Sequence, residues 1–345
     1  MKYLLLPLLL LSQTLLAAGN TRILFGSCIH QDDPAPILHS INQEKSDLFI
    51  FLGDNIYGDT EDMDILKKKY QKQKNRPEFA RLLQQTPTVA IWDDHDFGIN
   101  DGGADYPQKE ASRQLMLDFW QEPADSARRS RPDGIYTSYW LNHAGKNIHI
   151  ILPDLRWNRP ALNSVTLEQY KKDKAPENLG PYLPHTEAKK SMLGEAQWQW
   201  LEAELNKPAD LIILGSSLQT LADFTGWESW ANFPYDRNRL LATIADNNIR
   251  NILLISGDTH WGEFSKVALN NGYQLWDITS SGLTQEWKQV SPNRNRVGGF
   301  SSSVNYGEIL VDWDQQQLTF MLRDVDGKTV MSHTLSLQQG QLSPL

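Results

Sequence analysis

The sequence LFIFLGDNIY, residues 48–57, contains the pattern that decides the fold. Its apolar run 48–52 is typical of a buried strand, because it is short, rich in Phe, Ile and Leu, and ends at a glycine. Asp54 and Tyr57 follow at once. In a sheet covered on both faces, side chains just beyond the carboxyl ends of the strands converge on one crevice. The pattern therefore predicts an α/β sheet with oxygen ligands at one edge.

Two further apolar runs end in the same way. Residues 89–92 lead into the acidic cluster Asp93-Asp94-His95-Asp96, and residues 252–255 lead into Asp258 and His260. Residues two apart in an extended segment point to the same side, so Asp258 and His260 make a good half of a metal site. The consecutive carboxylates of the cluster repel one another unless they are solvated or bind a cation. Three strands that deliver such side chains favour a metal cage over a structural core.

The rest of the chain alternates strands with helices. Helices are expected at 36–42, 62–84, 108–120, 192–205 and 237–245, and Pro77 is expected to break the second. Strands are expected at 23–25, 211–214, 274–278, 309–313 and 318–322, and residues 135–141 and 148–152 read as a hairpin. This order predicts a four-layer α/β/β/α sandwich of two mixed sheets, formed by a single domain over residues 20–345.

The first nineteen residues are typical of a cleavable signal peptide. Lys2 precedes an apolar run that begins at Leu4, and the small residues 17–19 follow. The run is too short to span a bilayer, and no later stretch is long and apolar enough to do so. The mature protein is therefore expected in the periplasm or outside the cell. Its formal net charge of −9 makes it a poor generic ligand for nucleic acid or for an anionic membrane.

Cys28 is the only cysteine of the chain. In an exported protein a single thiol has no partner for an intramolecular disulfide. Two interpretations stay open, a small buried hydrophobic residue or a thiolate held by a metal.

Two rival functions also stay open on these residues. Ser27, with Asp258 and His260 later in the chain, superficially matches the blocks of secreted serine esterases of the SGNH type. That function would leave Cys28 and the acidic cluster without a role. A calcium-stabilised binding protein could instead hold a glycan or lipid on tryptophans, namely Trp157, Trp227, Trp230, Trp261 and Trp287.

Four segments in order carry a family resemblance. They are GSC at 26–28, LGDNIY at 52–57, WDDHD at 92–96 and SGDTH at 256–260, and PDLR at 153–156 and MLGEAQW at 192–198 support them. Together they resemble the signature of the alkaline phosphatase D (PhoD-like) metallophosphatase family over nearly the whole mature chain. The resemblance implies an exported phosphoesterase that hydrolyses phosphate mono- or diesters through a metal-activated water.

The resemblance also implies a multinuclear site of iron and calcium. The implied ligands are Cys28, Asp54, Tyr57, Asp94, Asn100, Asp258 and His260. Cys28, Asp54 and Tyr57 would hold the iron-type ion, and Asp54 would bridge to calcium-type ions. The family more often has Glu where Asp96 stands, so which of Asp93, Asp94 and Asn100 contacts metal stays open.

Two residues are expected to handle the substrate. Arg156 follows the strand expected at 148–152, so it should reach the same crevice and grip phosphate oxygens with its planar guanidinium. The alternative for Arg156 is a surface salt bridge. His95 would donate a proton to the leaving oxygen, or it would orient a neighbouring aspartate.

Overall fold

The computed structural model describes residues 19–143, 145–187 and 189–345. The expected signal peptide therefore lies, apart from Gly19, outside the described residues. None of the helices in the described ranges is long and apolar enough to cross a membrane.

The first sheet has seven strands in the order β16-β15-β14-β13-β1-β2-β3. In chain order these are β1 (Asn20–Gly26), β2 (Leu48–Leu52), β3 (Thr88–Ile91), β13 (Asn305–Asp312), β14 (Gln317–Asp324), β15 (Thr329–Gln338) and β16 (Gln341–Pro344). The pairs β1–β2 and β2–β3 are parallel, whereas β13 to β16 form an antiparallel meander that joins β1. Every residue of β2 is buried, as its apolar run predicted.

The second sheet also has seven strands, in the order β12-β10-β11-β9-β8-β5-β4. They are β4 (Thr137–His143), β5 (Lys146–Leu152), β8 (Leu211–Ser216), β9 (Ile252–Ser256), β10 (Gly262–Ala268), β11 (Gln274–Ser280) and β12 (Arg296–Ser301). The strands β5, β8, β9 and β11 run parallel, and β4 and β5 form the expected antiparallel hairpin.

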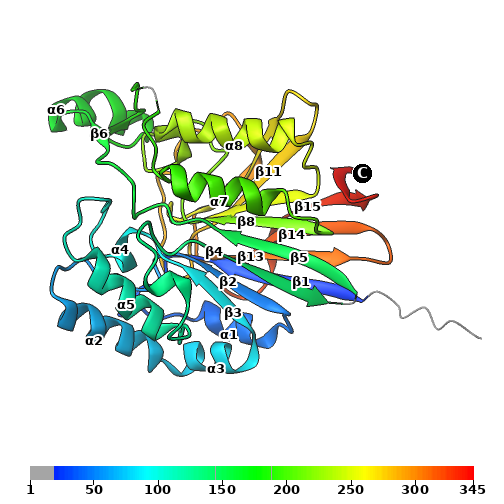
Figure 1. Cartoon of the computed structure of the whole chain (residues 1–345), viewed down its shortest axis with the longest axis horizontal. Helices are drawn as coiled ribbons and strands as arrows, with labels where there is room; N and C mark the ends of the chain where they lie inside the picture. The colour runs from blue at the N-terminus through cyan, green and yellow to red at the C-terminus, as the bar shows by residue number, and fades with distance from the viewer. Residues whose placement is uncertain (1–18, 144, 188) are drawn as a thin grey trace, which may run out of the picture.

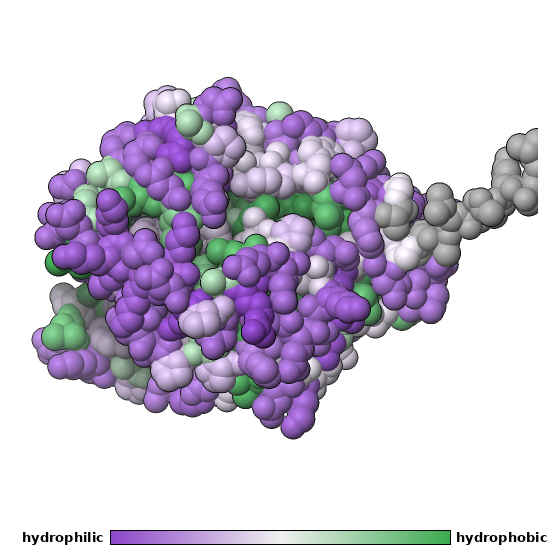
Figure 2. Space-filling view, turned by 90° about the horizontal axis from the view of Figure 1, so that it is seen from below, coloured by the Kyte–Doolittle hydropathy of each residue, from purple (hydrophilic) through white to green (hydrophobic). Residues whose placement is uncertain are grey.

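Helices cover the outer face of each sheet (Figure 1). Below the first sheet lie α1 (Ile37–Gln43), α2 (Met63–Lys74), α3 (Pro77–Gln85) and α5 (Lys109–Phe119), and above the second lie α7 (Glu195–Leu205) and α8 (Pro234–Asp246). Hydrophilic residues cover most of the face seen from below, as expected for amphipathic outer helices (Figure 2). The predicted four-layer α/β/β/α sandwich is confirmed.

The core lies between the two sheets. A Cβ on Gly215 of β8 would lie 2.6 Å from Leu152 and 3.0 Å from Leu52 of the opposite sheet, so the two layers touch there. At the other side of the core the ring of Phe320 in β14 packs 4.9 Å from Phe264 in β10. Apolar contact on this scale fixes how the two sheets stack, and with them the loops at their edges.

The break at Pro77 is also confirmed. Asp62 caps α2 by accepting hydrogen bonds from the backbone of Asp64 and Ile65, and Pro77 begins α3 at its first position. A proline is well tolerated there because that N–H has no partner within the helix.

Short elements complete the chain. They are α4 (Asp94–Phe97), α6 (Leu167–Gln169), β6 (Asn163–Ser164), β7 (Tyr182–Leu183), the π-helical turn Tyr170–Lys174 and the 3₁₀ turns Ala127–Arg129, Ala175–Glu177 and Trp230–Asn232. Residues 158–184 form an excursion over the surface that contains β6, α6 and β7.

Candidate metal centre

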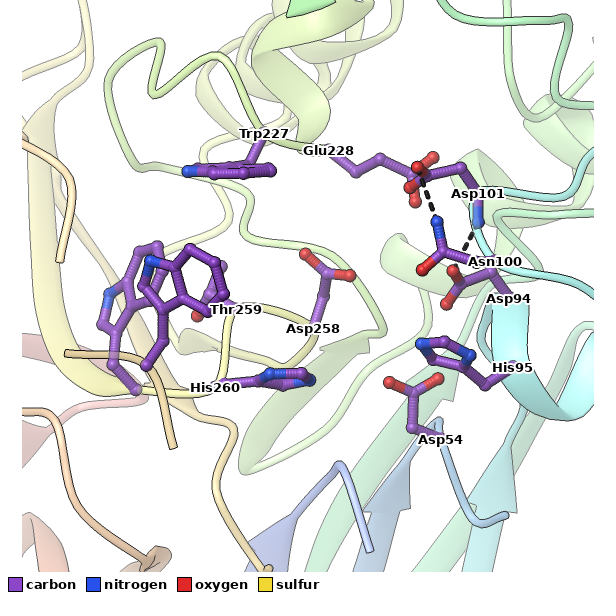
Figure 3. A pocket seen from close by; sticks show the side chains of 12 residues that line it. Asp54, Asp94, His95, Asn100, Asp101, Trp227, Glu228, Asp258, Thr259 and His260 are labelled. Atoms are coloured by element: carbon purple, nitrogen blue, oxygen red, sulfur yellow. Dashed lines mark hydrogen bonds between the residues drawn. The ribbon is translucent and has the colours of Figure 1, made fainter. Parts of the chain in front are cut away.

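The carboxyl ends of parallel strands from both sheets surround one cavity of about 190 Å³. Asp54 follows β2, Asp94 and His95 follow β3, and Asp258 and His260 follow β9. Figure 3 shows Asp54, Asp94 and His95 facing Asp258 and His260 across this space. The loops that the sequence predicted would converge therefore do lie together.

Cys28, Asp54, Tyr57 and His260 form one corner of the cavity. One ligand atom each from Cys28, Asp54 and His260 lies within 4.8 Å of the others. Cys28 Sγ is 3.3 Å from Asp54 Oδ2, and Tyr57 Oη is 3.0 Å from His260 Nε2. Four of the seven expected ligands thus share one corner, and it contains the thiol.

The backbone at this corner adopts an unusual conformation. The φ angles of Cys28, Asp54, Asp258 and His260 are 63°, 49°, 75° and 61°. These values lie in the left-handed region, which residues other than glycine rarely adopt. Each residue held in this conformation costs on the order of 1–3 kcal/mol of stability. Such strained conformations are typical of functional sites, where the surrounding structure imposes them.

A glycine allows the loops after β2 and β3 to approach each other. Gly53 has φ 106°, and a Cβ there would lie 2.4 Å from the Cβ of Asp93. No other residue fits this position without moving one of the two loops.

Carboxylates form the rest of the wall. Asp93, Asp94 and Asp258 present ligand atoms within 4.8 Å of one another, and Asp94 makes a second such group with Asp101 and Glu228. A third group joins Asp94 to Asp54 and His95. Asp94 therefore belongs to all three acidic groups, which makes it the best placed of the open candidates in the 93–101 segment.

The donor set of this cavity fits cations. Asp54 Oδ1, Asp93 Oδ2 and Asp94 Oδ1 are buried and have no hydrogen-bond partner among the described residues. Burial, followed by the charge of Cys28, raises the pKa of Asp54 well above its usual value, and burial, followed by Asp93, does the same for Asp258. Burial also raises the pKa of the Cys28 thiol to about 12. A cation would favour the charged form of each group and would pair the orphaned oxygens.

His95 is oriented by a residue that the sequence did not single out. Its Nδ1 lies 2.7 Å from Asp59 Oδ1, and its ring lies on Tyr57 with the centroids 4.1 Å apart. Burial opposes the charge of the imidazole, but Asp54, Asp94 and Asp59 together raise its pKa to about 10. This geometry leaves Nε2 of His95 for the cavity.

Arg156 lies behind the wall and not in the cavity. Its side chain is fully buried, with Nε 2.5 Å from Asp93 Oδ1 and Nη1 2.7 Å from Glu228 Oε2. Nη2 lies 3.6 Å from Asp94 Oδ1. The sequence-based expectation that the guanidinium reaches the crevice is not met, because three buried carboxylates surround it.

Asn100 and Asp101 lie at the rim. Asn100 is exposed and donates a hydrogen bond to Asp101 Oδ2 at 2.8 Å, while the backbone N–H of Asp101 donates to Asp94 Oδ2 at 2.6 Å. The hydroxyl of Tyr182, from the excursion, donates to the Asp101 carboxylate. Asn100 lines the cavity, and its amide oxygen is the atom that could bind a cation.

Ser27 does not form a serine esterase triad. It is 1% exposed, and the one side-chain hydrogen bond of Ser27 in the described structure joins its Oγ to Cys28 Sγ at 3.3 Å. The imidazole of His260 instead pairs with Tyr57.

Sequence reasoning did not identify Glu228 or Asp59 as part of this centre. Glu228 lies in a loop without an apolar run before it, and Asp59 lies just beyond the motif that contains Asp54 and Tyr57. No spacing in the sequence signals that Glu228 lines the cavity or that Asp59 pairs with His95.

Comparisons with known proteins identify the family and the fold. A family model described as PhoD-like phosphatase matches residues 24–322. The chain belongs to this PhoD-like phosphatase family. Alkaline phosphatase D of Bacillus subtilis (strain 168) is 24% identical over 258 residues, which cover 63% of this chain and 42% of that protein. The chain thus spans well under two thirds of the length of this relative.

Two solved structures share the fold. One, titled "Structure of PhoD", superposes with a TM-score of 0.70 at 16% identity and covers 94% of this chain and 71% of its own. The other, described as GAP50, the anchor in the inner membrane complex of Plasmodium, has a TM-score of 0.58 at 14% identity and covers 93% of this chain and 90% of its own. At these identities the likeness concerns the fold alone.

Proposed function

We propose that this member of the PhoD-like family is an exported metal-dependent phosphoesterase that hydrolyses phosphate mono- or diesters. The observation that supports it best is the cavity at which Cys28, Asp54, Asp94, Asp258 and His260 meet. Buried carboxylate oxygens without partners, a thiol and an imidazole there make a donor set for both hard and softer cations.

We assign the cations by their ligand preferences. The corner of Cys28, Asp54, Tyr57 and His260 suits an iron-type ion, since it offers a thiol, a phenol and an imidazole. The carboxylates of Asp94 and Asp258, with Asn100 at the rim, suit calcium-type ions, which prefer oxygen ligands. Asp54 belongs to a thiol-containing group and to an acidic group, so it is the residue placed to bridge the two sets.

When bound, these cations would lower the pKa of water and neutralise charge on the phosphoryl oxygens. Side chains of the protein would supply the proton transfer and the positioning of the ligands. His95, oriented by Asp59 at 2.7 Å, presents Nε2 to the cavity and is placed to donate a proton to the leaving oxygen. Arg156 positions Asp93, Asp94 and Glu228 from behind and does not touch the substrate in this proposal.

Turnover and metal content together test the proposal. Purified protein should hydrolyse p-nitrophenyl phosphate or bis(p-nitrophenyl) phosphate, lose that activity with a chelator, and regain it with added iron and calcium salts. A calcium-stabilised binding protein would also respond to a chelator, but it would show no turnover.

Asp54→Asn and His260→Ala should each abolish hydrolysis while the protein stays folded. Two exposed residues provide matched controls. Asp62→Asn keeps the cap of α2, because Asn caps as well as Asp, and His39→Ala removes an exposed imidazole from α1. Substantial turnover in either site variant, with unchanged metal content, would refute the assignment of the centre.

Export has a separate test. The protein recovered from the periplasm or the medium should begin near residue 19 or 20 by N-terminal sequencing. An N-terminus at Met1 in protein that stays in the cytoplasm would contradict this part of the proposal.

A further inference from the structure

Three tryptophans line the same cavity as the candidate metal ligands. Trp227 lies on the side of Thr259 and His260 in Figure 3, whereas Asp54, Asp94, Asp101 and Glu228 line the other side. Trp261 follows His260 in the chain, and the backbone of Trp287 is bonded to that of His260. Figure 3 shows the Trp227 ring above Asp258, at the edge of the space between the two sets of ligands. The cavity therefore has an acidic part and an aromatic part.

Two of these rings, those of Trp227 and Trp287, are not ordinary core residues. Trp92, Trp198 and Trp230 are fully buried, as most tryptophans of a core are, but Trp227 and Trp287 are only partly buried. Their exposed surface faces a cavity that the metal ligands share. Core packing alone does not account for two indoles held in this way.

Trp287 is held by the metal corner itself. Its backbone N–H donates to the carbonyl oxygen of His260 at 3.0 Å, and its indole N–H donates to the carbonyl of Gln289 at 3.0 Å. The ring position is therefore coupled to a candidate metal ligand.

Trp227 is held by the surface excursion. The backbone N–H of Tyr182 donates to the carbonyl of Gly226 at 2.9 Å, and the ring of Tyr170 lies edge-on to Trp227 at 6.5 Å. Trp227 and Trp287 are themselves nearly perpendicular, with centroids 5.5 Å apart at 76°. The two rings form a fixed corner before any ligand binds, which lowers the entropic cost of binding one.

The chemistry of this corner selects among ligands. A sugar presents several hydroxyl groups, and each needs a hydrogen-bond partner when it is buried. Besides the indoles, the aromatic side offers Thr259 Oγ1, a buried hydroxyl without a partner among the described residues. A planar aromatic group needs few such partners, since it gains mainly from stacking on one ring and edge contact with another.

The size of the cavity sets a further limit. Its volume of about 190 Å³ is below the roughly 300–1,000 Å³ of pockets for drug-sized ligands. It suits a phosphate with one ring better than a long lipid or a nucleic-acid strand.

We propose that Trp227 and Trp287 form a subsite for a planar aromatic group attached to the phosphate of the substrate. The class of substrate is an ester with one aryl or heteroaromatic group beside the phosphorus. This inference deepens the proposed function and rests on the phosphate binding at the adjacent metal centre.

Phosphonates test the subsite without hydrolysis. Phenylphosphonate, cyclohexylphosphonate and methylphosphonate share one head group, and the first two are similar in size but differ in flatness. We expect phenylphosphonate to bind the metal-loaded protein about ten-fold more tightly than cyclohexylphosphonate in calorimetry, as for one stacked ring. Equal binding of these two would overturn the proposal, and this comparison needs no variant.

Variants then locate the effect. Trp287→Leu and Trp227→Leu keep an apolar side chain but remove the ring, so each should reduce the ratio of the two dissociation constants toward one. Trp140→Leu is the matched control, because Trp140 of β4 is 42% exposed and stacks on His149 of β5 instead of lining the cavity. An unchanged ratio in both site variants would overturn the assignment.

Turnover of p-nitrophenyl phosphate by the same preparation separates the two proposals. Turnover without a preference for the phenyl group would refute the aromatic subsite and leave the proposed function intact. A clear phenyl preference without any turnover would support the subsite and refute the proposed hydrolysis.

Discussion

Arg156→Ala is expected to destabilise the fold and not only to weaken catalysis. The guanidinium pairs with Asp93 at 2.5 Å, Glu228 at 2.7 Å and Asp94 at 3.6 Å, and all four side chains are at most 4% exposed. Removing one partner of a buried ion pair costs roughly 3–5 kcal/mol, because the other charge stays buried without compensation. Glu228 has a second cation in Arg159, at 3.4 Å, so the loss falls mainly on Asp93 and Asp94, and we expect the free energy of unfolding to fall by about 3 kcal/mol.

Urea denaturation of the metal-loaded protein measures this loss. Arg294→Ala is the control, because its side chain is 87% exposed and its pair with Asp223 should contribute little to stability. Arg156→Lys should recover part of the loss, since one ammonium cannot reproduce the fork between Asp93 and Glu228. If Arg156→Ala keeps the wild-type midpoint and slope but loses kcat/KM, the guanidinium faces the substrate and the argument from burial is wrong.

Three more outcomes are expected. Gly53→Ala places a Cβ 2.4 Å from Asp93 at a φ of 106°, so denaturation should show a loss of roughly 1–3 kcal/mol and activity should fall, whereas Gly340→Ala, with nothing within 4 Å, should keep its activity. Ser27→Ala should keep most phosphoesterase activity in a kinetic assay, and a hundred-fold loss would revive the serine esterase. Chelation should lower the melting temperature, because a cation at 100 times its Kd stabilises by about 2.7 kcal/mol; an unchanged melting temperature would contradict a metal bound to the native state.

The fold was predictable where a single local feature of the sequence determines where a helix or strand begins or ends. Pro77 ends one helix and begins the next for a steric reason that the sequence states directly. The sequence did not predict β10, β12, β15 or β16. For β12 and β15 the reason is the opposite one, the lack of a local signal. The sequence of β12, RVGGFS, contains two glycines, and β15 exposes both faces of its first half, so neither shows a clean apolar period. Pairing with β10 and β14, which is tertiary, makes them strands.

Part of the candidate site was predictable because its residues follow strands that have a clear apolar pattern. Asp54, Asp258 and His260 come directly after buried runs, and the edge of a sheet collects such residues. Arg156 also follows a strand, yet its side chain turns away from the cavity. The direction depends on Glu228, which lies 72 residues further along the chain and which no local pattern marks.

The negative charge of the residues that line the cavity explains why a buried Arg156 is consistent with a phosphatase. Asp54, Asp94, Glu228 and Asp258 line the cavity, and no Lys or Arg is among the described residues that do. A phosphate ester is itself an anion, so carboxylates at short range in a low dielectric would repel it. The imidazole of His95, whose pKa is raised, supplies one positive charge; the rest of the positive charge that the phosphate needs must come from bound cations, and the carboxylates are the groups that would hold them. In the proposed function Arg156 would serve the substrate indirectly, because it pairs with the carboxylates of the acidic wall and does not line the space that the phosphate requires.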